Sequence, residues 1–205
     1  MLKYNTKLNY KDMKHLASLA TALLFSLSAF AQSGGYKLGD KVADFTLKGV
    51  NNENTSLSNF TNAKTVVLVF TNNQCPYAKL YENRLVTLAS SYGSKGVQFV
   101  YINSGAGDAG ETLQDMGTKK YSPYLSDEGQ KISSQFGATK TPEVFVLHNN
   151  NGEFILKYKG AIDDNPQVAG DVKNFYLKNV LDEVLANKAL TSTDKRATGC
   201  LIKKY

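Results

Sequence analysis

The chain has 205 residues, of which 42% are hydrophobic and 11% are aromatic, enough for one packed domain with extensions. This composition excludes a chain that is disordered over most of its length. The formal net charge is +6, but residues 1–31 hold four lysines and one aspartate, so the remainder carries only +3. Such a modest charge gives no reason to expect a partner that is a nucleic acid.

The N-terminal residues 1–31 have the pattern of a secretory signal peptide. Lys14 precedes an apolar run, residues 16–31, that ends in Ala29-Phe30-Ala31, a small-x-small cleavage pattern. The run is short for a membrane span and no basic stop-transfer segment follows it, so we expect cleavage rather than an uncleaved anchor. Met13 is an alternative start of translation. The sequence therefore predicts an exported protein, periplasmic or secreted, with no membrane span after cleavage.

The first half of the remaining chain predicts strands followed by a helix. Residues 42–47 alternate in polarity as a strand does, and the Asn-rich segment 51–54 predicts a turn. The run Thr65–Phe70 is apolar and β-branched, which predicts a buried central strand. A helix is expected from Pro76 to about Tyr92, closed by Gly93, with an apolar face made of Leu80, Leu85, Leu88 and Ala89.

The second half predicts more alternation of strands and helices. In chain order we expect a strand at 97–102, helices at 111–120 and 128–136, strands at 143–148 and 153–158, and a long helix at 167–187. The Asn/Gly-rich turn 149–152 predicts that the last two strands form a hairpin. Strands separated by helices indicate parallel pairs, to which the hairpin adds an antiparallel edge.

Cys75 has the strongest chemical signal in the sequence. It follows the polar loop 71–74 and directly precedes Pro76, which suits the first turn of a helix. Cys75 is therefore expected at the N-cap, at the positive end of the helix dipole. Free backbone N–H groups there can stabilise a thiolate and lower the pKa of a cysteine from about 8.5 to about 3.5–7.5. We expect a nucleophilic sulfur.

Cys200 is the second cysteine of the chain and lies near its C-terminus. Export places both cysteines in an oxidising compartment, where an even pair can form a disulfide. Two interpretations stay open: a permanent structural disulfide, or a redox pair in which Cys200 resolves an intermediate formed on Cys75. After the signal peptide His148 is the one histidine, so no metal site is expected and no cofactor is predicted.

Four stretches of the sequence have a pattern in common with known proteins. They are Gly39-Asp40 with Ala43–Leu47, Phe70 with Cys75–Ala78, Thr141-Pro142, and Tyr158–Asn165 with Thr198–Lys203. Over residues 36–205 the chain resembles the peroxiredoxin-like branch of the alkyl hydroperoxide reductase/thiol-specific antioxidant family, in the thioredoxin superfamily. The resemblance implies an α/β, thioredoxin-like fold: a central mixed sheet flanked by helices, an N-terminal β extension, and a C-terminal helix and tail.

The resemblance also implies a domain division and a substrate site. The signal peptide at 1–31 would precede a redoxin domain at 36–190 and a tail at 191–205 that carries Cys200. Thr141-Pro142 would contain a cis-proline peptide, with the Thr141 backbone exposed to pair with an extended substrate; a simple tight turn is the alternative. Pro76 and Tyr77 would line the same site, although Tyr77, like Tyr81, is equally well explained as a packing residue.

The chain departs from the motifs of the family at positions that bear on activity. Ala78 stands where thioredoxins with a C-x-x-C motif have their second cysteine, which excludes dithiol exchange within one motif. Asn72 stands where peroxiredoxins have a threonine, three positions before the cysteine, so the hydroxyl that helps to hold a peroxide is missing. Neither Arg84 nor Arg196 can be matched to the distant arginine of the family.

Together these observations favour an exported thiol-disulfide oxidoreductase with Cys75 as the nucleophile and Cys200 as the resolving cysteine. One alternative is a thiol-dependent peroxidase that uses the same residues. Another is a non-catalytic binding module with a structural Cys75–Cys200 disulfide. The expected partners are a protein or small-molecule disulfide, or a peroxide, and a thiol reductant; the sequence names neither of them, nor the oligomeric state.

Overall fold

The computed structural model describes residues 34–105 and 111–203. Gly34–Tyr205 forms one compact unit, and the predicted signal peptide lies outside the described residues. Among the described residues, every helix is too short or too polar to cross a membrane.

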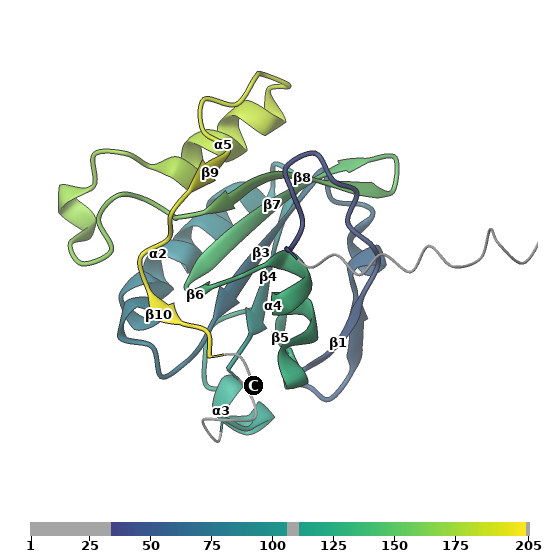
Figure 1. Ribbon diagram of the computed structural model, residues 1–205, viewed down its shortest axis with the longest axis vertical. Helices are drawn as coiled ribbons and strands as arrows, with labels where there is room; N and C mark the ends of the chain where they lie inside the picture. Colours follow the sequence, from purple (N-terminus) through teal and green to yellow (C-terminus); the bar gives the residue numbers. More distant parts are fainter. Residues whose placement is uncertain (1–33, 106–110, 204–205) are drawn as a thin grey trace, which may run out of the picture. The chain divides into compact units, whose positions relative to one another are not determined.

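A mixed β-sheet with the strand order β2-β1-β5-β4-β3-β7-β8-β9 forms the centre of the fold (Figure 1). β3 (Thr65–Thr71) pairs in parallel with β4 (Val97–Asn103) and antiparallel with β7 (Glu143–Asn150). All residues of β3 are buried because both faces of the sheet are covered, as its apolar β-branched sequence predicts. The predicted hairpin of β7 with β8 (Glu153–Gly160) is confirmed.

Further strands extend the sheet on both sides. β1 (Thr46–Gly49) and β2 (Asn54–Ser56) form a hairpin that joins the sheet through β5 (Tyr124–Ser126). β9 (Asp194–Lys195) pairs in parallel with β8 at the opposite edge. A separate antiparallel pair links two distant parts of the chain, β6 (Lys140–Thr141) and β10 (Cys200–Leu201). The sequence patterns did not predict β5, β6, β9 or β10, each of which has only two or three residues.

Helices cover the two faces of the sheet, and the alternation of side chains along β3 explains how. Val67 and Val69 point to the face on which α2 (Pro76–Gly93) and α5 (Tyr176–Leu185) pack. The side chains between them point to the other face, which α4 (Lys131–Phe136) covers with Ile132 and Phe136. The thioredoxin-like α/β fold that we expected is therefore present.

Several predicted helices are confirmed with changed bounds. α2 begins and ends within one residue of the prediction, but Leu80, expected on its buried face, is 48% exposed, whereas Tyr81 is buried. The helix expected at 128–136 is split into η2 (Glu128–Gln130) and α4, because Gly129 and Gln130 both have a positive φ, of 74° and 56°. The helix expected at 111–120 is reduced to α3 (Leu113–Met116).

The predicted bounds of two other elements are partly wrong, because polar side chains accept backbone N–H groups that the strand or helix would otherwise use. The strand expected at 42–47 begins only at Thr46, since Asp44 Oδ1 accepts hydrogen bonds from the N–H groups of Phe45 and Ser58. The long helix expected at 167–187 begins only at Tyr176. Before it, the side chains of Asp164 and Asn165 accept backbone N–H groups of the segment, which forms a loop with one short turn, η3 (Ala169–Asp171). The 3-10 turn η1 (Leu57–Phe60) follows β2.

Candidate active site

Cys75 lies at the N-cap of α2, directly beyond β3, as the Cys-Pro pattern predicts. Its backbone is extended (φ −68°, ψ 120°), and its carbonyl accepts the first helical hydrogen bond, from Lys79 N at 3.1 Å. Pro76 occupies the first helical position, where its missing N–H group removes no hydrogen bond. The Cys75 residue is only 4% exposed. Cys75 therefore occupies a fixed, nearly enclosed position at the end of the most buried strand.

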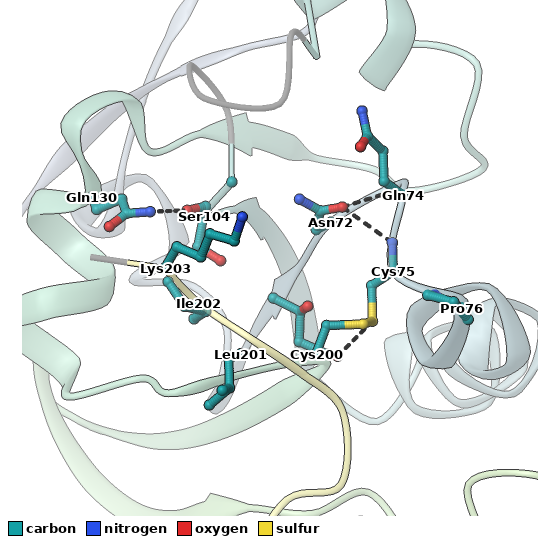
Figure 2. A pocket seen from close by; sticks show the side chains of 12 residues that line it. Asn72, Gln74, Cys75, Pro76, Ser104, Gln130, Cys200, Leu201, Ile202 and Lys203 are labelled. Carbon is teal, nitrogen blue, oxygen red and sulfur yellow. Dashed lines mark hydrogen bonds between the residues drawn. A yellow bond between two sulfur atoms is a disulfide. The ribbon is translucent and has the colours of Figure 1, made fainter. Parts of the chain in front are cut away.

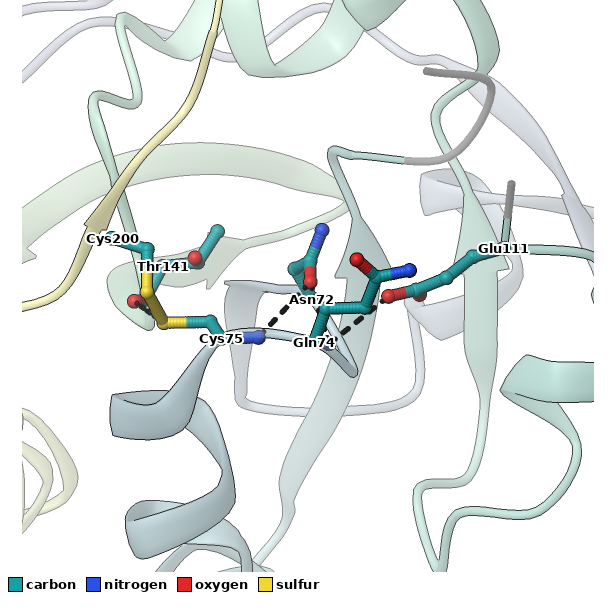
Figure 3. Close-up of a disulfide and its surroundings, with 6 residues drawn as sticks. All are labelled: Asn72, Gln74, Cys75, Glu111, Thr141 and Cys200. Atoms are coloured by element: carbon teal, nitrogen blue, oxygen red, sulfur yellow. Dashed lines mark hydrogen bonds between the residues drawn. A yellow bond between two sulfur atoms is a disulfide. The ribbon is translucent and has the colours of Figure 1, made fainter. Parts of the chain in front are cut away.

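Side-chain acceptors hold the loop that leads from β3 to Cys75. Asn72 Oδ1 accepts the backbone N–H groups of Gln74 at 2.7 Å and of Cys75 at 3.2 Å. Glu111 reaches the same loop from the segment before α3, and its Oε1 accepts Gln74 N at 3.1 Å (Figure 3). Its Oε2 accepts Asn73 N at 3.3 Å. Hydrogen bonds of this kind, with a charged acceptor, are stronger than those between neutral groups.

Tyr124 and Asn103 extend this support into the sheet. The Tyr124 hydroxyl donates to Asn73 Oδ1 at 2.9 Å, and the Asn103 side-chain amide donates to Glu111 Oε2. Burial raises the pKa of Tyr124 well above its ordinary value, and the neighbouring Glu111 carboxylate raises it further. The phenol therefore stays protonated at neutral pH and remains a donor to the loop.

Cys200 is bonded to Cys75 through a disulfide with an S–S distance of 2.06 Å (Figure 3). The two Cα atoms lie 5.9 Å apart, although 125 positions separate the residues in sequence. Cys200 is the first residue of β10, and in the antiparallel register it lies opposite Thr141, with Leu201 opposite Lys140. The fold therefore brings the C-terminal tail to the N-terminus of α2.

Thr141 lies on the other side of the disulfide, and its peptide bond to Pro142 is cis, as the resemblance predicted. The Thr141 carbonyl oxygen is 3.0 Å from Cys75 Sγ. A disulfide sulfur carries no hydrogen, so this is a close contact, which becomes a possible hydrogen bond once Cys75 is a thiol. Glu143 fixes the preceding turn, because its Oε2 accepts the N–H groups of Thr139 at 2.7 Å and Lys140 at 3.1 Å.

A pocket of about 250 Å³ opens beside the disulfide (Figure 2). Three side-chain amides contribute to its wall, those of Asn72, Gln74 and Gln130, and Gln130 donates to the Ser104 carbonyl at 3.0 Å. The remaining lining residues include four of the tail, Cys200, Leu201, Ile202 and Lys203. A part of the pocket wall is thus formed by the C-terminal tail, which the disulfide and the short strand β10 hold against β6.

The predicted site residues do not all meet. Cys75, Cys200, Thr141 and Pro76 line the pocket, and Pro142 is buried next to Thr141. Tyr77 is half-buried on α2 and is not part of the pocket lining.

Two other residues near the N-terminal half of α2 have structural roles. Tyr81 packs in the core and donates its hydroxyl to Asp163 at 2.6 Å. Arg84 forms an ion pair with Asp163 at 2.7 Å and donates to the Asn165 carbonyl, so it binds the segment after β8 and does not reach the disulfide. The other arginine, Arg196, is exposed on the tail.

Sequence reasoning missed the supporting residues of the site. From the sequence, Asn72 indicates only the loss of a hydroxyl, whereas in the structure its side chain organises the loop that carries Cys75. Glu111 gave no signal, because nothing in the sequence relates it to a loop 37 or 38 positions earlier. In the ranges 34–105 and 111–203, no group of three His, Cys, Asp or Glu side chains is placed to hold a metal ion.

Comparisons with known proteins agree with this geometry. The AhpC/TSA family model matches residues 38–164, more than half of the chain. A hypothetical protein of Sinorhizobium meliloti has a similar structure, with a TM-score of 0.74 and 31% identity, over 84% of this chain and 97% of that one. An uncharacterized conserved protein of Geobacillus kaustophilus has a TM-score of 0.73 and 28% identity, over 82% and 92% of the two chains.

A more distant likeness agrees with the fold alone. A putative thiol:disulfide interchange protein DsbE of Chlorobium tepidum has a TM-score of 0.56 and 21% identity, over 74% of this chain and 99% of that one. The comparison with curated proteins returns no match. From the family match and the fold, the chain belongs to the AhpC/TSA family, a peroxiredoxin-like branch of the thioredoxin superfamily, and within it carries a disulfide between Cys75 and Cys200.

Proposed function

We propose that the protein is an exported thiol-disulfide oxidoreductase in which Cys75 is the nucleophile and Cys200 the resolving cysteine. The observation that carries the proposal is the bond between a cysteine at a helix N-terminus and a cysteine on a two-residue terminal strand. A disulfide that served only to staple the fold would need neither the helix N-terminus nor a strand so short. A thiolate at Cys75 gains from the dipole of α2, whereas one at Cys200 has no such support.

The reaction proceeds in two exchange steps. In the reduced protein the Cys75 thiolate attacks a substrate disulfide, a Cys75–substrate bond forms, and the other substrate sulfur leaves as a thiolate. The Cys200 thiolate then attacks Cys75 Sγ, the Cys75–Cys200 disulfide forms, and the second substrate thiolate leaves. Two electrons pass from the protein to the substrate. Two external thiol groups reverse both steps: the first forms a mixed disulfide with Cys75 and frees Cys200, and the second releases Cys75 and leaves bonded to the first as a disulfide.

The redox midpoint of the Cys75–Cys200 couple tests this proposal. Equilibration against glutathione or thioredoxin buffers is expected to give a midpoint in the range of exchange proteins, about −120 to −270 mV. The Cys200→Ser variant is the control: a mixed disulfide between Cys75 and the buffer thiol should form in it and accumulate, because no resolving cysteine is present. A midpoint below about −300 mV would identify a permanent structural disulfide and overturn the proposal in favour of a non-catalytic binding module.

A peroxidase is the second candidate, because the family that matches residues 38–164 is named for alkyl hydroperoxide reductase. In that reaction the Cys75 thiolate attacks a peroxide oxygen, a sulfenic acid forms, and an alcohol leaves; Cys200 then forms the disulfide and water leaves. Asn72, whose carboxamide oxygen is engaged by two backbone N–H groups, replaces the peroxide-holding hydroxyl. Stopped-flow consumption of hydroperoxide by the reduced protein, compared with reduction of a disulfide, separates the two candidates.

We also propose export, on the pattern of residues 1–31 alone. The expected mature protein begins at Gln32. N-terminal sequencing of the protein recovered from outside the cytoplasm tests this directly. A protein that keeps residue 1 and stays in the cytoplasm would contradict it.

A further inference from the structure

The outer edge of β6 is the place where an extended segment would pair beside Cys75, and the chain's own tail occupies it. Cys200 lies opposite Thr141 and Leu201 opposite Lys140 in the antiparallel register. The pairing continues for one more residue, since Ile202 N donates to the Thr139 carbonyl at 3.0 Å. The tail is therefore bound as an added strand, by backbone hydrogen bonds on one side of a short edge.

Gly199, directly before β10, lies against the Thr141–Pro142 peptide. A Cβ atom at this position would lie 2.2 Å from the Thr141 carbonyl oxygen and 2.7 Å from its carbon. Both atoms belong to the backbone, so they cannot move aside as the end of a flexible side chain can. Even an alanine would have to shift the strand away from β6 and the sulfur away from Cys75.

The tail side chains beyond Cys200 alternate between the two sides of the strand. Leu201 is 71% exposed and Lys203 is exposed, whereas Ile202 is half-buried against the core cluster that contains Phe136 and Phe145. Recognition of the strand therefore depends on three features: a residue without a side chain before the cysteine, the cysteine itself, and an apolar side chain two positions after it.

We propose that this edge selects extended partner segments with the pattern glycine-cysteine-any residue-apolar, and that such a segment binds only after β10 has left. This inference rests on the proposed function and names the substrate class of the same site. During exchange, the partner's sulfur is bonded to Cys75 while its backbone occupies the edge of β6. When the Cys200 thiolate attacks Cys75 Sγ and the partner's thiolate leaves, β10 takes the edge back. Tail and partner thus alternate on one surface.

Peptide exchange tests the proposal in the full chain. In the Cys200→Ser variant, Cys75 is loaded as a mixed disulfide with thionitrobenzoate, and a peptide thiolate then displaces the chromophore. The peptide Thr-Gly-Cys-Leu-Ile-Lys copies residues 198–203, and its partner peptide has alanine in place of glycine. We expect the glycine peptide to react at least about tenfold faster, a difference of about 1.4 kcal/mol. Any competition from the tail slows both peptides equally and cancels in the ratio.

The reaction of both peptides with the thionitrobenzoate mixed disulfide of free cysteine gives the intrinsic reactivity of the two thiols. Equal rates of the two peptides on the protein, after this correction, would overturn the proposal. If Cys75 cannot be loaded at all, the exchange function fails, and the surface is then judged by a measurement that needs no external substrate.

That measurement is the equilibrium of the Cys75–Cys200 disulfide with glutathione in two glycine variants of the two-cysteine chain. Gly199→Ala is expected to shift the equilibrium by about tenfold or more toward the open form. Gly170→Ala is the matched control, because a Cβ atom at Gly170 would meet nothing within 4 Å. Equal equilibria in the two variants would show that the edge of β6 does not read the residue before the cysteine, and the inference would be wrong.

Discussion

The two sulfurs of one disulfide have very different supports. Cys75 is held by a fully buried strand, an 18-residue helix, and a loop whose N–H groups bind Asn72 and Glu111. Cys200 is held by a strand of two residues, of which the other, Leu201, is exposed. The disulfide therefore joins a position held by long elements, the fixed side, to a position held by a short strand, which detaches in the proposed reaction. In the proposed reaction, the cysteine on the fixed side is the nucleophile, and the cysteine on the detachable side is the resolving cysteine.

The tail has a second attachment that limits how far it can move. β9 pairs in parallel with β8, and Ala161 N donates to the Lys195 carbonyl at 2.9 Å. Gly160, with φ 123°, makes this close approach possible, because a Cβ atom there would lie 1.7 Å from the Lys195 oxygen. When β10 leaves β6, the tail therefore remains tethered at β9, with Arg196–Gly199 as the connecting segment. The tether keeps Cys200 near Cys75 without fixing it there.

The largest effect is expected on reduction of the disulfide. The bond closes a loop between residues 125 positions apart, and a cross-link of that length stabilises a fold by up to about 5 kcal/mol through the entropy of the unfolded chain. We expect the free energy of unfolding to fall by several kcal/mol in reductant, measured by urea denaturation. Hydrogen exchange should increase at Ile202 N but not in the loop before Cys75.

The matched control for this measurement is the Cys75→Ser/Cys200→Ser double variant, whose stability should not respond to reductant. If instead the loop before Cys75 exchanged as fast as the tail after reduction, the two supports would not differ as described. The disulfide would then be organising both sides of the site.

A smaller effect is expected from Glu111→Gln, which acts on the fixed side. Glu111 is largely buried, and its two carboxylate oxygens accept the N–H groups of Asn73 and Gln74. A glutamine has only one side-chain oxygen, so its N–H₂ group would face one of these two donors. Leaving a buried donor unpaired costs about 1–3 kcal/mol. Urea denaturation should report this loss, and alkylation of Cys75 in the Cys200→Ser background should change in rate. Glu128→Gln, at an exposed position, should change neither.

The long apolar elements of this fold were predictable because their sequence patterns are local. β3 is a continuous apolar run of strand length, α2 repeats apolar residues at helical spacing, and an Asn/Gly-rich turn marks the hairpin of β7 with β8. The Cys-Pro pair likewise placed Cys75 at the N-cap, since proline at the first helical position is a local rule.

The rest of the site depends on contacts that the sequence does not encode locally. β6 and β10 have two residues each, too few for any period, and they exist because the fold brings residues 140 and 200 together. The need for glycine at 199 becomes visible only against the Thr141 carbonyl. The support from Glu111 depends in the same way on a loop distant in sequence.

The pH dependence of stability distinguishes the roles of two buried tyrosines: Tyr124, which supports the fixed loop, and Tyr101, which does not. Burial raises the pKa of Tyr124 and of Tyr101 far above the ordinary value of about 10. Above that pH the unfolded chain loses phenolic protons that the folded chain keeps, so stability falls as pH rises. Each tyrosine contributes up to about 1.4 kcal/mol of loss per pH unit.

Phenylalanine variants show the difference in urea denaturation. Tyr124→Phe should cost about 1 kcal/mol at neutral pH, because the bond to Asn73 is lost, and the gap to the parent should close toward about pH 11. Tyr101→Phe should cost less, since no described residue bonds to the Tyr101 hydroxyl, and it should exceed the parent at alkaline pH. Parallel curves for all three proteins would contradict the role of Tyr124.

The smallest effect is expected on the detachable side, at the exposed residue of β10. Leu201→Ser should change the stability of the oxidised protein by no more than about 0.5 kcal/mol, because the side chain is 71% exposed. Ile202→Ser, one residue later, should cost more, since its side chain packs against the core cluster of α4. Urea denaturation and the glutathione equilibrium should rank the two variants in the same order. If Leu201→Ser were as costly as Ile202→Ser, the tail would be held on both of its faces, and a strand held so firmly could not alternate with a partner on the edge of β6.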